Sequence, residues 1–205
     1  MRILTILAAF CVIASGVSAD PTRAIDQAVR AVFTEMPDIE EVSEISGYCG
    51  ATMTTNPDII YCTNERRVYV RAGFWGEPQA PYALAHVMGH AAQVQHGVAD
   101  RAFRAIQQSP QNEDALRSMV TRQVHCLAGV YYNRAGFVRT TLTSLYQREP
   151  FTKSYWGRDP VGRGPRVSIG MAPRNEWFLI GQGHGDPLQC SVEEVSAEPL
   201  ARGLR

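Results

Sequence analysis

The sequence predicts an α+β fold that is predominantly helical and carries a small β-hairpin or sheet. Most segments of the 205-residue chain repeat their apolar side chains at helical spacing. Residues 59–62 and 68–70 instead place β-branched and aromatic side chains on either side of a polar turn, which is typical of a hairpin. The sequence contains no internal repeat, linker or low-complexity tract, so we expect a single domain over residues 20–205.

Residues 1–19 have the composition of an export signal. Arg2 supplies a positive charge, an apolar run extends over residues 3–13, and Val17–Ala19 forms a small-residue cleavage site. The alternative is a membrane anchor, but the apolar run is shorter than a bilayer span requires. We therefore expect a mature chain that begins at Asp20, is periplasmic or secreted, and keeps no stable membrane anchor.

The charge of the chain argues against nucleic acid as a partner. Its 20 Lys and Arg residues balance 20 Asp and Glu residues, and the arginines are spread along the sequence. A nucleic-acid-binding surface needs clustered positive charge. A protein or peptide partner is still possible.

Removal of the export signal leaves Cys49, Cys62, Cys126 and Cys190 of the 5 cysteines. An even number of cysteines in an exported chain predicts disulfides. Spacing alone does not choose among the three pairings. A thiolate metal site is the competing use, but the close CxxC spacing of such sites is missing.

Helices are expected along most of the mature chain, each with one apolar stripe that faces the core. Residues 150–170 are rich in glycine and proline and predict a long loop. The expected helices cover residues 21–36, 82–97, 99–107, 115–134, 137–148 and 174–181.

Two histidines of the helix expected over 82–97 stand one turn apart. His86 and His90 are at i and i+4 and therefore share one face of the helix. Zinc peptidases use this spacing in His-Glu-x-x-His, where the histidines hold the metal and the glutamate is the general base. Here Val87 follows the first histidine. Thr121 and His125 are likewise one turn apart on the helix expected over 115–134.

Taken in order, several stretches of the chain resemble the putative neutral zinc metallopeptidase family of bacteria. That resemblance implies a zincin-like metallopeptidase helix pair, with a small sheet before it and helices after it. It also implies the disulfide pairs Cys49–Cys62 and Cys126–Cys190. The matching stretches are Tyr61-Cys62, Val68-Tyr69-Val70, Phe74, the helix from His86 to His90 with Gln95 behind it, Gln123 with Cys126-Leu127-Ala128-Gly129-Val130, Trp177-Phe178 and Gly185-Asp186-Pro187-Leu188-Gln189-Cys190.

The resemblance also implies roles for five residues. His86 and His90 match the family's histidine ligands, Val87 stands at the general base, and Thr121 stands at the third ligand, a glutamate. His125 replaces an aspartate one turn later. Zinc is the candidate cofactor, with His86, His90 and His125 as a three-histidine site. The competing interpretation of His125 is a polar residue hydrogen-bonded inside the former cleft.

These replacements favour a zinc-metallopeptidase-like pseudoenzyme without a catalytic residue, which acts as a binding or scaffolding domain. Loss of a positioned general base costs about 10²- to 10⁴-fold in rate. The alternative is a divergent zinc-dependent hydrolase or peptidase that uses the three-histidine site, because zinc itself lowers the pKa of its bound water to about 7. A third hypothesis is a structural or interaction protein whose histidines have no chemical role.

Overall fold

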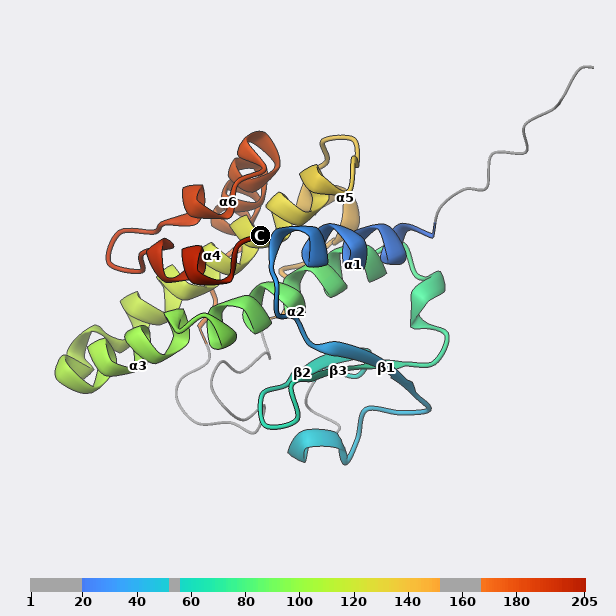
Figure 1. Cartoon of the computed structure of the whole chain (residues 1–205), viewed down its shortest axis with the longest axis horizontal. Helices are drawn as coiled ribbons and strands as arrows, with labels where there is room; N and C mark the ends of the chain where they lie inside the picture. The colour runs from blue at the N-terminus through green and yellow to red at the C-terminus, as the bar shows by residue number, and fades with distance from the viewer. Residues whose placement is uncertain (1–19, 52–55, 152–166) are drawn as a thin grey trace, which may run out of the picture.

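The computed structural model describes residues 20–51, 56–151 and 167–205. This part of the chain has the predicted fold class, predominantly helical α+β with a small sheet (Figure 1). The export signal over 1–19 and most of the loop over 150–170 lie outside the described residues. Among the helices that the structure describes, none is long and apolar enough to cross a membrane.

Helix α1 (Pro21–Val32) begins where the sequence places a proline in the first turn. The Asp20 carboxylate accepts a hydrogen bond from the Thr22 amide at 3.0 Å and caps the helix. In Figure 1, α2 lies between α1 and the sheet. The other helices are α2 (Ala80–Gln95), α3 (Val98–Gln108), α4 (Glu113–Arg134), α5 (Leu142–Leu145) and α6 (Met171–His184).

The sheet contains the predicted hairpin of β2 (Ile59–Cys62) and β3 (Arg67–Arg71), which pair antiparallel. Alternate residues of β3 serve two apolar clusters. Val68 and Val70 join the main core with α2, whereas Tyr69 packs on the opposite face around the Cys49–Cys62 disulfide. The central strand β3 is therefore buried on both faces.

A third strand, β1 (Asp38–Val42), was not predicted. It pairs in parallel with β3, giving the order β1-β3-β2. Its sequence Asp-Ile-Glu-Glu-Val is too acidic to suggest a strand, but β1 is an edge strand, and Glu40 accepts a hydrogen bond from Arg67 at 2.6 Å. Cross-strand pairing with an arginine compensates for the low strand propensity.

The helix expected over residues 137–148 is wrong outside α5 (Leu142–Leu145). Tertiary hydrogen bonds hold the preceding backbone extended. The side chain of Gln182 accepts from the Thr140 amide at 3.0 Å and donates to the Thr140 carbonyl at 2.8 Å, and Asn175 accepts from the Leu142 amide at 2.8 Å. These bonds to α6 replace the local helical ones.

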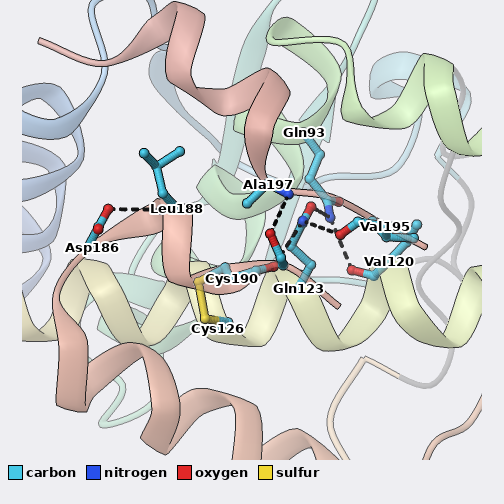
Figure 2. Close-up of a disulfide and its surroundings, with 10 residues drawn as sticks. Gln93, Val120, Gln123, Cys126, Asp186, Leu188, Cys190, Val195 and Ala197 are labelled. Carbon is cyan, nitrogen blue, oxygen red and sulfur yellow. Dashed lines mark hydrogen bonds between the residues drawn. A yellow bond between two sulfur atoms is a disulfide. The ribbon is translucent and has the colours of Figure 1, made fainter. Parts of the chain in front are cut away.

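Both disulfides implied by the resemblance are confirmed. Cys49 pairs with Cys62 under the sheet, and Cys126 of α4 pairs with Cys190 near the C-terminus. Figure 2 shows a hydrogen-bonded link beside the second disulfide, in which Gln93 of α2 donates to Gln123 of α4 at 2.8 Å. Gln123 in turn donates to the Cys190 carbonyl at 3.0 Å. The C-terminal segment is thus fixed to both central helices.

Helices α4 and α6 approach each other closely at two glycines. A Cβ on Gly129 would overlap the carbonyl oxygen of Phe178, and one on Gly181 would overlap that of Cys126. The absence of side chains therefore lets the two backbones touch. Arg174 lies about two helical turns before Gly181 and so faces α4 as well.

Candidate active site

Helices α2 and α4 bring the three predicted histidines together. Gly89, between His86 and His90, faces α4 closely enough that a Cβ there would lie 3.2 Å from the Val124 carbonyl oxygen. The ring centroid of His86 lies 4.9 Å from that of His90 and 4.9 Å from that of His125. Residues 35 or more positions apart in sequence thus share one cluster, in which His86 and His125 are buried and His90 is half-buried.

His125 uses both of its ring nitrogens. Its side chain is 0% exposed, its Nδ1 is hydrogen-bonded to the Tyr82 hydroxyl, and its Nε2 lies 2.6 Å from Nη1 of Arg174. A guanidinium only donates hydrogen bonds. The Nε2 atom of His125 must therefore accept, which leaves the proton of the neutral ring on Nδ1 to be donated to the Tyr82 oxygen.

Arg174 is a buried cation with a carboxylate on its other side. The residue is 1% exposed, and its Nε donates to Oε1 of Glu149 at 2.7 Å. Glu149 also accepts from the amides of Ile169 at 3.1 Å and Gly170 at 2.9 Å, just before α6 begins. Charge pairing and the helix N-terminus together hold the Glu149 carboxylate in place.

His86 is buried without a polar partner among the residues that the structure describes. It is 2% exposed, and neither ring nitrogen has a hydrogen bond there. Its ring stacks on Phe151, with centroids 4.0 Å apart and an interplanar angle of 5°. Unpaired nitrogens of this kind are uncommon and indicate a position that a ligand or an ordered water fills.

Removal from water favours the neutral form of all three imidazoles. It lowers the pKa of His86 and of His125 well below the ordinary value, and the charge of Arg174 acts in the same direction. Burial and then Arg174 lower the pKa of His90 from 6.5 to about 4. At neutral pH the cluster therefore contains one permanent cation and three uncharged rings.

Two of the three replaced positions, Val87 and Thr121, have structural roles. Val87 is 6% exposed and belongs to the main apolar core. The Thr121 hydroxyl donates to the Arg117 carbonyl one turn earlier on α4, at 2.9 Å. Neither side chain offers a group that could accept a proton from water.

Comparison with a family model shows to which protein family the chain belongs. The model of the putative neutral zinc metallopeptidase family matches residues 39–151, slightly more than half of the sequence. The chain belongs to this family. The matched range contains His86, Val87, His90, Thr121 and His125, whereas Arg174 and Cys190 follow it. Comparisons with curated proteins and with solved structures found no match.

The family's name indicates zinc, but the residues of this metallopeptidase-like chain do not fit a three-ligand zinc site as they are arranged. Arg174 takes the lone pair that His125 would need on Nε2, and the Nδ1 of His125 faces Tyr82. Among the described residues, one set of three or more potential ligand atoms lies within 4.8 Å of one another, at Cys49, Cys62 and Glu65. Those cysteines form a disulfide. Coordination by His86, His90 and His125 stays a prediction that requires Arg174 to move.

Three residues of this family member were missed by the sequence reasoning. Tyr82, Glu149 and Arg174 form the polar surroundings of His125. Tyr82 precedes His86 by four residues on the same helix face, a spacing that could have identified it. The sequence carries no comparable signal for Glu149 and Arg174, since an ion pair between distant segments depends on packing.

The neutral histidines predict an acid-sensitive fold. Unfolded histidine has a pKa near 6.5, so between pH 6.5 and about 4 the unfolded chain binds protons that folded His90 does not. The free energy of unfolding should thus fall as the pH drops through this window, by up to about 2.5 kcal/mol for His90 at about pH 4.5. Above the window this contribution is constant. The charged group and rings that face His90 are Arg174, His86 and His125.

Urea unfolding of the wild type and of His90→Gln at neutral pH and at about pH 4.5 measures this effect. The variant lacks the titrating ring and should lose less stability on acidification than the wild type. An identical pH dependence in the two proteins would show that His90 does not contribute.

Proposed function

We propose that the chain is an exported, non-catalytic member of the zinc metallopeptidase family that acts as a binding or scaffolding domain for a protein or peptide. The observation that carries this proposal is the position of Val87. A hydrocarbon side chain that is 6% exposed in the core stands directly after the first histidine of the His-x-x-x-His helix. It neither accepts nor donates a proton.

Two further observations support loss of the peptidase reaction. The Thr121 hydroxyl donates a hydrogen bond to a carbonyl of its own helix. Both ring nitrogens of His125 are hydrogen-bonded, to Arg174 and to Tyr82. A zinc peptidase needs a metal with an open position, a base for the water and a polarised carbonyl. The base alone is worth about 10²- to 10⁴-fold in rate.

Export is supported by the disulfides and by the composition of residues 1–19. Disulfides persist in oxidising compartments and are rare in the cytosol. Cys49–Cys62 and Cys126–Cys190 together use all cysteines of the expected mature chain. We place the protein in the periplasm or outside the cell.

One observation favours the alternative of a divergent zinc hydrolase. Both ring nitrogens of His86 lack a hydrogen-bond partner among the described residues, as expected of a histidine that binds a ligand. A hydrolase of this kind would depend on His86 directly. The test of function therefore compares the wild type with a His86 variant.

Hydrolysis of fluorescent casein and of a peptide library by the mature chain provides that test. We expect the same background rate for the wild type and His86→Ala, with and without added zinc. Val87→Ala, which changes an apolar core residue next to the histidine, controls for altered folding. Hydrolysis that a chelator abolishes and His86→Ala removes, while Val87→Ala retains it, would establish the hydrolase instead.

A further inference from the structure

The buried guanidinium of Arg174 occupies a position that conflicts with metal binding. Its Nη1 lies 2.6 Å from the Nε2 of His125, and its Nε lies 2.7 Å from Glu149. At 1% exposure the side chain cannot turn toward water without opening the packing of α6 on α4. Arg174 is thus fixed by a partner at each end.

This contact decides which atoms of His125 are available. An arginine side chain has no acceptor and is not deprotonated in proteins, so Nε2 of His125 must be the acceptor. The remaining proton lies on Nδ1, which faces the Tyr82 oxygen. A metal ion needs a free imidazole lone pair, and His125 has none.

The charge of Arg174 acts in the same direction as the hydrogen bond. Burial lowers the pKa of His86, His90 and His125 most, and the Arg174 charge lowers each of them further, so that charge acts on all three rings. A divalent cation held by these rings would lie beside a permanent positive charge in a buried setting, where screening is weak. Glu149 offsets that charge from the far side of Arg174, and among the described residues it forms no hydrogen bond or ion pair with a histidine.

We propose that Arg174 excludes divalent transition metals from the histidine cluster, by reserving the Nε2 of His125 and by its charge. The chain then folds and acts without zinc. In this arrangement the three-histidine site is latent, since neutralising Arg174 frees His125 beside His86 and His90. Exclusion of the metal is a separate property from the loss of peptidase activity.

Cobalt and zinc titrations of the mature chain test the inference. Tetrahedral Co²⁺ gives a visible absorption band, and calorimetry measures zinc affinity directly. We expect no band for the wild type or for Arg174→Lys, which keeps the charge. Arg174→Gln should bind zinc at least about tenfold more tightly than the wild type, the size of effect typical for residues that adjoin metal ligands. Arg71→Gln, which breaks the half-buried Arg71–Asp58 pair at the sheet, should behave as the wild type.

A second substitution identifies the ligands. The gain of Arg174→Gln should disappear in Arg174→Gln/His125→Ala. If it persists, the released Glu149 binds the metal, and the reservation of His125 is refuted. Equal binding by the Lys and Gln variants would refute the role of charge, and a folded Arg174→Gln that binds no more tightly than the wild type would refute the inference as a whole.

The zinc content of the wild type tests the exclusion of metal even if Arg174→Gln does not fold. Stoichiometric zinc in wild-type protein from zinc-replete cells, lost in His86→Ala, would overturn the inference. Substoichiometric zinc that is the same in both proteins supports it. Because the readout is metal rather than hydrolysis, a zinc-loaded chain without peptidase activity would leave the proposed function intact.

Discussion

Replacing Gly181 with alanine is expected to lower the free energy of unfolding by about 3 kcal/mol or more, the upper end of the cost of overpacking. A Cβ on Gly181 would overlap the carbonyl oxygen of Cys126 and lie 2.8 Å from the Val130 amide nitrogen. Because both atoms belong to the backbone of α4, no side-chain rotation relieves the overlap. The two helices would have to separate. Urea unfolding followed by circular dichroism measures the loss.

Gly183 provides a matched control on the same helix. A Cβ there meets nothing within 4 Å. Gly183→Ala should therefore be neutral or slightly stabilising, since alanine is favoured over glycine in a helix by about 1 kcal/mol. Equal stability of the Gly181 and Gly183 variants would contradict the close approach of α4 and α6.

Removing the disulfide of Cys126 and Cys190 is expected to cost about 4 kcal/mol. The bond joins residues with a sequence separation of 64, so it strongly restricts the unfolded chain. Its loss would also loosen the segment whose Cys190 carbonyl accepts from Gln123. The midpoint of urea unfolding of Cys126→Ala/Cys190→Ala, compared with the wild type, gives the cost.

The shorter disulfide serves as the comparison. Cys49 and Cys62 have a sequence separation of 13, for which the same entropy argument gives about 3 kcal/mol. The Cys49→Ala/Cys62→Ala variant should therefore be the more stable of the two. The reverse order would show that strain or packing, rather than loop entropy, sets the contribution of these bonds.

The helices that support the site could be predicted because their apolar residues repeat regularly. The helix expected over 82–97 is α2 (Ala80–Gln95), and that expected over 115–134 is α4 (Glu113–Arg134). Strand β1 was not predicted because its own residues have low strand propensity. It is a strand because it pairs with β3. Residues 137–148 were predicted as a helix because hydrogen bonds to α6 are not visible in a local pattern.

The candidate site could be predicted only in part for the same reason. Spacing on one helix identifies His86 and His90, and family resemblance adds His125. The partners of His125 depend on where α6 packs. That position is set by the contact of Gly129 with Gly181, which places Arg174 against His125. A sequence pattern shows which side chains share a face of one helix or strand. A buried ion pair joins residues of different elements, so no local pattern predicts it.

The most direct measurement of the metal-free histidine cluster is a long-range ¹H–¹⁵N spectrum of the imidazole rings at neutral pH, before and after one equivalent of zinc. We expect His125 to be neutral with its proton on Nδ1, because Nε2 accepts from Arg174. Zinc should leave the resonances of His86, His90 and His125 unchanged. Zinc-dependent shifts of the ring nitrogens of all three histidines would contradict this and establish a working metal site.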